Sequence, residues 1–191
     1  TLVFTLAGNT YVPYFFAEAC DITPCEVIFK DQNGTELGRI ETYEGATLAE
    51  IPYTEANLPT IDEGSKFRGW YYNSGKKVTV GDVINGNTTI QALVTPIETA
   101  TVGSVQTYPL NNSIFYPEDH ETIEIAGGSF HDGTHGWHFA ANGTIKVQVA
   151  GNAVVVVTMC TYSESGEVVV TDANGTELGR ASVVKNETSD G

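Results

Sequence analysis

Basic residues are scarce in this chain of 191 residues. Lysine and arginine together number 9, against 24 aspartates and glutamates, and the formal net charge is −15. Nucleic-acid binding depends largely on Lys and Arg contacts to phosphate, and anionic membrane surfaces attract the same side chains. The composition therefore argues against nucleic acid and against an anionic membrane surface as partners.

Long hydrophobic runs are also missing. No apolar stretch approaches the roughly 18–20 residues that cross a bilayer, and no basic segment followed by an apolar core marks a signal peptide. Hydrophobic residues still make up 41% of the chain, which is enough to bury a core. We expect no membrane insertion. An acidic, Lys-poor chain rich in Thr and Gly is typical of a secreted or cell-surface protein.

Cysteine is limited to three residues, Cys20, Cys25 and Cys160. In a secreted protein, one disulfide and one leftover thiol is the natural count, and three pairings are open. A Cys20–Cys25 bond would close a small loop around Pro24, whereas a Cys20–Cys160 bond would join the N-terminal segment to the C-terminal half. The alternative is that all three thiols are reduced and buried.

Catalytic motifs are absent as well. Ser163 and Ser165 have no Gly-x-Ser-x-Gly context, and no Gly-rich phosphate loop lies between a strand and a helix. The acidic residues at 118–124 cannot be assigned as a catalytic pair from sequence, and no Asp-x-Asp-x-Asp-Gly calcium loop is present. We expect a protein that is not an enzyme and has no cofactor, with Ca²⁺ as a minor alternative.

What the chain does contain is one heptapeptide in two copies, Asn-Gly-Thr-Glu-Leu-Gly-Arg, at residues 33–39 and 174–180. A β-rich apolar run and an acidic residue, Asp31 or Asp172, precede each copy. Asn-Gly between apolar runs is a strong hairpin signal, because a type I′ turn needs positive φ at both central residues. The sequence therefore predicts two hairpins of one kind, in two different modules.

Turn signals and apolar periodicity divide the chain into five segments, and they predict a mainly β fold. These segments are a strand segment at 1–18, a linker at 19–25, a module at 26–95, a linker at 96–104 and a second β module at 105–191. In the first module we expect four strands and one short helix within residues 48–58. In the second we expect strands at 122–125, 144–149, 153–161, 167–171 and 178–184.

The first module resembles the Listeria–Bacteroides repeat, the B-type repeat of internalin-like surface proteins. The resemblance covers about a third of the chain and is carried by Val27-Ile28-Phe29 with Asn33-Gly34, Gly45-Ala46-Thr47-Leu48, Phe67-Arg68-Gly69-Trp70-Tyr71 and Gly86-Asn87-Thr88-Thr89-Ile90-Gln91-Ala92. It implies a β-grasp-like α+β fold and a bacterial surface protein, without catalytic residues. One departure is that the last strand reads Ala-Leu-Val where the family usually has Ala-x-Trp.

The second module resembles β-sandwich or jelly-roll modules of gut Firmicutes surface proteins and polysaccharide-degrading proteins. The matching stretches are residues 132–139, 147–153 and 172–175. This type of sandwich has a further strand after Val184, where the chain becomes polar. Conversely, residues 1–7 read as a closing strand, with Leu2, Phe4 and Leu6 on one face.

Residues 1–18 could therefore complete the second module. Completion by donation between chains or neighbouring repeats would build a head-to-tail fibre, since an incomplete sandwich leaves apolar surface and a sheet edge open. Completion within one chain and an unrelated N-terminal hairpin are the alternatives. On the first interpretation Leu2, Phe4 and Leu6 are the assembly residues, and the chain itself is the partner.

The remaining candidate sites are weak. His131, His135 and His138 could surround a metal with Asp132 as a carboxylate ligand, but Gly133 and Gly136 make the segment a loop, so no metal site is expected. Tyr14, Tyr108 and Tyr116 are the candidate aromatic residues for stacking on a sugar. Trp70 and Trp137 lie within module motifs and are expected in the cores.

The function expected from the sequence is that of a non-catalytic extracellular bacterial surface module with a structural or adhesive role. In this interpretation it self-associates by β-strand complementation into a fibre or tandem array. The alternative is a carbohydrate-binding module attached to a polysaccharide-degrading enzyme, with polysaccharide as the partner.

Overall fold

The protein is described by a computed structural model that covers residue 8, residues 21–161 and residues 165–184. The predicted assembly residues Leu2, Phe4 and Leu6 lie outside the described residues, as do Tyr14 and Cys20. In the described part the chain is mainly β, as the sequence predicts, and it forms two compact units, Thr1–Pro96 and Ile97–Gly191. No helix in that part is long and apolar enough to cross a membrane.

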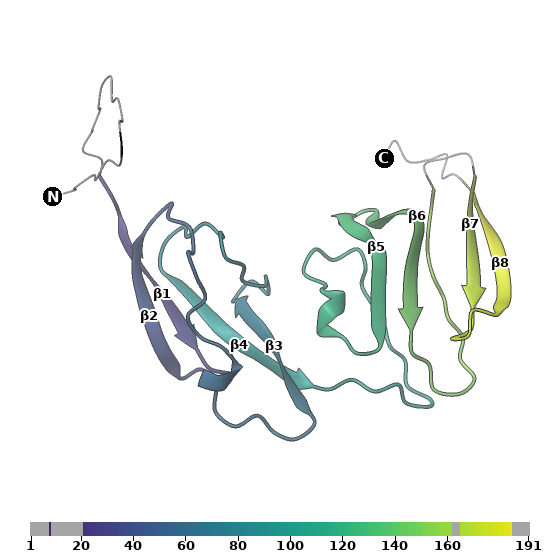
Figure 1. Cartoon of the computed structure of the whole chain (residues 1–191), viewed down its shortest axis with the longest axis horizontal. Helices are drawn as coiled ribbons and strands as arrows, with labels where there is room; N and C mark the ends of the chain where they lie inside the picture. The colour runs from purple at the N-terminus through teal and green to yellow at the C-terminus, as the bar shows by residue number, and fades with distance from the viewer. Residues whose placement is uncertain (1–7, 9–20, 162–164, 185–191) are drawn as a thin grey trace. The chain divides into compact units, whose positions relative to one another are not determined.

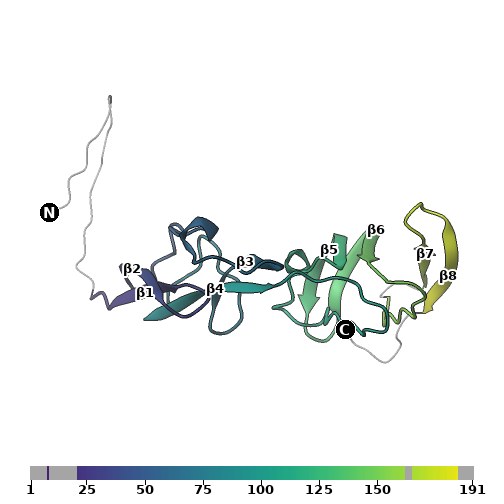
Figure 2. The same cartoon turned by 90° about the horizontal axis from the view of Figure 1, so that it is seen from below.

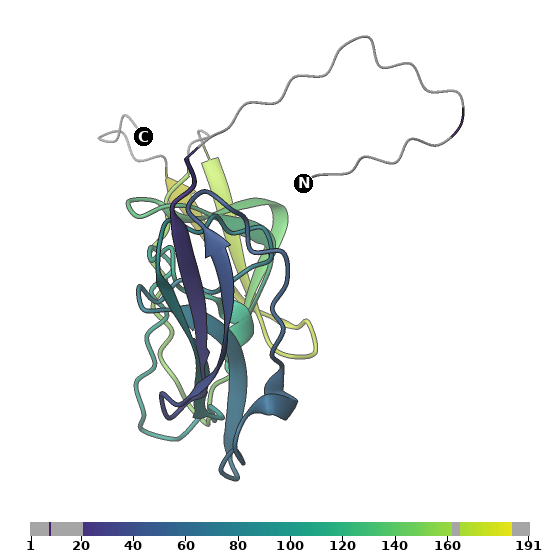
Figure 3. The ribbon, with the colours of Figure 1, turned by 90° about the vertical axis from the view of Figure 1, so that its left-hand side faces the viewer.

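The first unit contains one four-stranded sheet of order β2-β1-β4-β3 (Figure 1). Its strands are β1 (Pro24–Lys30), β2 (Glu36–Tyr43), β3 (Ser65–Tyr72) and β4 (Thr88–Pro96). The β1–β2 and β3–β4 pairs are antiparallel, and Figure 3 shows β1 and β2 side by side. β1 and β4 pair in parallel, with Val27 opposite Thr88 and Lys30 opposite Gln91. The central strands are thus far apart in sequence.

The core of the first unit is built on one face of this sheet. Val27, Phe29 and Ile90 are fully buried, because alternate residues of β1 and β4 point to the same face. The ring of Trp70 meets that of Phe29 edge-on, with ring centroids 5.6 Å apart, and its indole N–H donates a 2.8 Å hydrogen bond to the Tyr53 carbonyl. Trp70 therefore lies in the core, as expected from its motif.

The helix expected within residues 48–58 does not form. The segment contains a single 3-10 turn, Glu55–Asn57, and the flanking residues 49–54 have no regular structure. Pro52 and Pro59 leave room for only six residues between them, and a proline disfavours helical backbone at the residue before it. Asn57 accepts a hydrogen bond from the Thr54 N–H at 2.8 Å, which stabilises the short turn.

The second unit has two separate two-stranded sheets, β5–β6 and β7–β8 (Figure 2). After the 3-10 turn η2 (Pro117–Asp119), the strands are β5 (Ile123–Asp132), β6 (Gly136–Val147), β7 (Ser165–Thr171) and β8 (Glu177–Val184). Few side chains are buried here: Phe115 and Ile123 are the apolar ones among the described residues, beside Thr122. Whether either module is a β-grasp or a sandwich stays a prediction.

The strand expected at residues 153–161 is not formed. This segment connects β6 to β7 as coil, apart from an isolated bridge residue at Thr161 (Figure 1). Four consecutive valines, Val154 to Val157, are 91%, 60%, 85% and 51% exposed. A continuous valine run is typical of a strand covered on both faces, and in the described residues no strand pairs with it or covers it.

The repeated heptapeptide forms two hairpins, but not through the expected type I′ turn. Gly34 has φ of +85° and Gly175 of +84°, whereas Asn33 and Asn174 lack positive φ, which among described non-glycine residues only Asn142 shows. In the first copy the Gly34 N–H donates to the Asp31 carbonyl at 3.1 Å. A type I turn followed by a left-handed glycine and a bulge fits this pattern.

An aspartate carboxylate explains why this turn forms in place of the type I′ turn. Oδ1 of Asp31 accepts the N–H groups of Asn33 and Thr35, each at 2.8 Å. Asp172 accepts those of Asn174 and Thr176 at 2.9 and 2.8 Å. The acidic residue before each heptapeptide is therefore part of the turn, since its carboxylate satisfies two backbone donors that the hairpin leaves open.

The cysteines allow one statement about pairing. Cys25 is buried in the first unit and Cys160 is exposed in the second, and both are free thiols. Each of the three pairings considered includes Cys25 or Cys160, so none of them is formed in this structure.

The core of the first unit can be tested at Phe29. Replacing Phe29 by alanine removes a fully buried ring in contact with Trp70 and Tyr53, and we expect the free energy of unfolding of this unit to fall by about 3–5 kcal/mol. Urea unfolding in a Trp137→Phe background measures it, with Trp70 as the fluorescent reporter. Val80→Ala is the control, because Val80 is 62% exposed, and equal losses in both variants would contradict the described core.

Candidate metal centre

The turn between β5 and β6 is organised by Asp132, the last residue of β5. Its Oδ1 accepts the backbone N–H of Thr134 at 2.8 Å and that of His135 at 2.7 Å. Gly136, which opens β6, has φ of +76°, and a Cβ added to it would lie 3.1 Å from the Leu110 carbonyl oxygen. Glycine is therefore required at this position, both for its φ and for the close approach of the neighbouring backbone.

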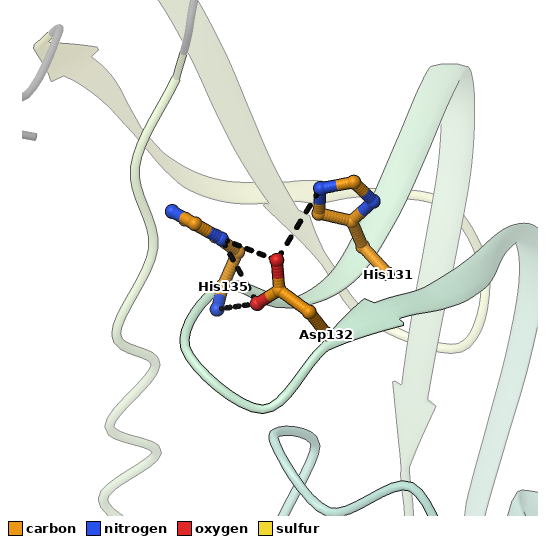
Figure 4. A group of neighbouring side chains, drawn as sticks. All are labelled: His131, Asp132 and His135. Atoms are coloured by element: carbon orange, nitrogen blue, oxygen red, sulfur yellow. Dashed lines mark hydrogen bonds and ion pairs between the residues drawn. The ribbon is translucent and has the colours of Figure 1, made fainter. Parts of the chain in front are cut away.

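Two histidines converge on the same carboxylate (Figure 4). Nδ1 of His135 lies 2.8 Å from Oδ2 of Asp132 and 2.9 Å from Oδ1, and Nε2 of His131 lies 3.4 Å from Oδ2. One ligand atom from each of the three residues can be chosen so that all lie within 4.8 Å of one another. Nitrogen and oxygen donors at such distances are the ligands that divalent transition metals take from proteins.

The electrostatics of the site follow from these hydrogen bonds. The His135 side chain, together with the backbone N–H groups of His135 and Thr134, lowers the pKa of Asp132 to about 2. The carboxylate is therefore ionised throughout the neutral range. His135 is the more enclosed of the two histidines, with its side chain 16% exposed against 55% for His131.

The structure brings together only part of the residues that the sequence singled out. His131, Asp132 and His135 form the group, whereas His138 does not belong to it. His138 lies in β6 opposite Ser129 and is exposed. Because β6 begins at Gly136, residue 138 takes part in the β5–β6 ladder and not in the turn.

Of the candidate sugar-stacking tyrosines, Tyr108 is held in other contacts. Tyr108 is half-buried, its ring packs against Phe115 and His120, and its hydroxyl lies 2.6 Å from Gln106 Oε1 and 2.7 Å from Thr122 Oγ1. Tyr116 is also half-buried and directly precedes η2. The ring of Tyr108 is thus engaged by its neighbours and not open for sugar stacking, so its geometry gives the carbohydrate-binding alternative no specific support.

A polar network around Thr122 was not found from the sequence. Thr122 is only 1% exposed. Its hydroxyl donates a hydrogen bond to one carboxylate oxygen of Glu98 at 3.0 Å. The other carboxylate oxygen of Glu98 lies 2.6 Å from Nδ1 of His120. Glu98 belongs to the segment expected to be a linker, 22 residues before His120. No local signal connects these positions. The network ties that segment to the residues that lead into β5 and satisfies buried polar groups.

No family model, no curated protein and no solved structure matches the chain. The resemblance to internalin-type repeats therefore stays a prediction from the residues quoted for it.

The carboxylate geometry predicts a specific pH response. His135→Gln removes the main cause of the lowered pKa, so the pKa of Asp132 should rise from about 2 towards the ordinary value of 3.8. Because the folded-state pKa is lowered, the stabilisation is complete above the ordinary value and is lost as the pH falls through 2. A ¹³C NMR titration of the carboxyl carbon measures the shift.

Asp172 is the internal control in the same spectra. Its pKa is lowered by hydrogen bonds from the Thr176 and Asn174 backbone and is independent of any histidine. The Asp172 titration should be unchanged in the His135→Gln variant. An Asp132 titration that is also unchanged would show that His135 does not act on this carboxylate.

Proposed function

We propose that the chain is a non-catalytic structural or adhesive module of an extracellular bacterial surface, and that it self-associates head-to-tail by β-strand complementation. The observation that supports this proposal is the contrast between the two copies of one hairpin. One copy is built into a four-stranded sheet over a core, and the other forms a two-stranded sheet in the described residues, with Val170 and Leu178 largely exposed.

The two hairpins are structural equivalents. Phe29 lies opposite Gly38 and Lys30 opposite Glu36, with a bulge between Phe29 and Lys30. In the second copy Val170 lies opposite Gly179 and Thr171 opposite Glu177, with a bulge at the same point. An ion pair across the strands is repeated too, Arg39 with Glu26 at 2.6 Å and Arg180 with Glu167 at 2.9 Å. The two hairpins therefore need the same kind of cover.

Their surroundings differ sharply. In the first unit β4 lies beside β1, and Phe29 is fully buried. In the second unit Val170, which corresponds to Phe29, is 53% exposed, and Leu178 is 69% exposed. Complete burial of a valine side chain contributes roughly 1.5–3 kcal/mol relative to leaving it in water. Covering this face would therefore be favourable.

The open edge can be located by analogy with the first unit. The β1 residues that pair with β4 are Val27–Lys30, and their equivalents in β7 are Val168–Thr171. In the described part of the chain the sheet of β7 contains only β8 as a neighbour. A strand added along Val168–Thr171 would provide backbone partners and a flanking apolar side chain, as Ile90 of β4 does opposite Phe29 in the first unit.

The proposed occupant is the segment 1–7 of a second copy. Its alternation places Leu2, Phe4 and Leu6 on one face, as a half-buried strand requires. Two chains with a net charge of −15 repel each other, but residues 1–17 contain no Asp, Glu, Lys or Arg. An uncharged donor strand can therefore approach an acidic partner with little electrostatic cost.

Donation from each copy to the next is a head-to-tail contact. Such contacts form an open filament unless their rotation closes a ring. A bacterial surface protein would gain length and mechanical continuity from this arrangement.

The assembly is tested with matched charge variants of the donor segment. We expect the wild-type chain to form species larger than one chain in light scattering after size exclusion, and Phe4→Glu/Leu6→Glu to reduce these to single chains. Thr1→Glu/Thr5→Glu is the control, because it adds the same charge on the opposite face of the strand. It should retain the larger species.

The acceptor is tested in the same measurement with Val170→Glu, which should also give single chains. A wild-type chain that is single at all concentrations would overturn the proposal. If that single chain is destabilised by Phe4→Glu/Leu6→Glu, residues 1–7 complete their own chain and no polymer forms.

A further inference from the structure

The β5–β6 turn has the donor set of a metal site, independent of assembly. Two imidazole nitrogens and one carboxylate oxygen converge from residues close in sequence, His131, Asp132 and His135. We propose that this turn binds one divalent transition-metal ion, of which Zn²⁺ is the representative, through His131 Nε2, Asp132 Oδ2 and His135 Nδ1.

The distances are close to those of a ligand sphere. Metal–nitrogen and metal–oxygen distances of about 2.0–2.2 Å place two tetrahedral ligand atoms roughly 3.3–3.5 Å apart. The Asp132 Oδ2 to His131 Nε2 distance is 3.4 Å, and that from Oδ2 to His135 Nδ1 is 2.8 Å. One ligand atom from each residue lies within 4.8 Å of the other two, so both rings are near ligand positions, and rotation of the exposed His131 side chain would complete the set.

The carboxylate is held ready for this role by the turn. Oδ1 of Asp132 is committed to the backbone N–H groups of Thr134 and His135, which fixes the plane of the carboxylate and directs Oδ2 towards the two rings. Partners that orient a ligand in this way strengthen metal binding. Metal binding would replace the hydrogen bond between His135 Nδ1 and the Asp132 carboxylate.

The class of ion follows from the donors and the charge. Imidazole favours Zn²⁺, Cu²⁺ and Ni²⁺ over Ca²⁺ and Mg²⁺, which take oxygen ligands. The net charge of −15 raises the local concentration of cations. Three protein ligands leave a fourth position for water or for a ligand from another molecule. This site therefore differs from a calcium site, the alternative that the acidic composition of the chain suggested.

The experiment is isothermal titration of ZnCl₂ into the full, untagged chain. We expect one ion per chain, and at least about a tenfold loss of affinity in each of His131→Gln, Asp132→Asn and His135→Gln. Asparagine at 132 can still accept the two backbone N–H groups, so the turn is kept while the anionic ligand is lost. The imidazole NMR signals of His131 and His135 should shift with Zn²⁺ in parallel with the heat.

His138→Gln is the matched control, because His138 is an exposed histidine of the same hairpin that lies outside the group. Its affinity for Zn²⁺ should stay within about twofold of the wild type. The proposal is overturned if wild-type chain takes up no Zn²⁺ at millimolar concentration, if the three ligand variants bind as well as the wild type, or if His138→Gln loses affinity to the same extent.

Discussion

A two-stranded hairpin cannot bury its own apolar face, and this constraint governs both units of the chain. Hairpins become stable when a third strand or another element covers them. In the first unit β4 does so by pairing with β1, and the rings of Phe29, Trp70 and Tyr53 pack together on the covered side. In the second unit the same hairpin lies beside no third strand in the described residues, and its valines remain in contact with water.

The parts of the fold that sequence could predict are the local ones. Asn-Gly after an apolar run predicted each hairpin, and the β-rich apolar run at residues 27–29 predicted the strand that contains Phe29. The turn type was wrong, because the Asn-Gly signal does not include the carboxylate of Asp31, which binds two backbone N–H groups and stabilises a different turn. The prediction of a helix within residues 48–58 was wrong, because two prolines leave too short a segment for one. Both prolines are visible in the sequence.

Longer-range features could not be predicted in this way. The parallel pairing of Val27 with Thr88, and the contact of Glu98 with His120, join residues that no local pattern connects. At the candidate metal centre the residue types and the loop were visible, since the glycines at 133 and 136 identify a turn. Which histidines meet depended on where β6 begins. That strand starts at Gly136, so His138 joins the ladder while His135 stays in the turn with Asp132.

The parallel β1–β4 pair also has a consequence for the order in which the first unit folds. A hairpin closes in roughly 1–10 µs, but β1 must then wait for a strand about 60 residues further along the chain, and contacts of such separation slow folding. During synthesis β1 and β2 leave the ribosome well before β4, with the edge of β1 unpaired. In that interval the nascent first unit has an unpaired β1 edge, like the edge of β7 that no strand pairs with among the described residues. Strand exchange between neighbouring nascent chains would be the characteristic folding error of this protein.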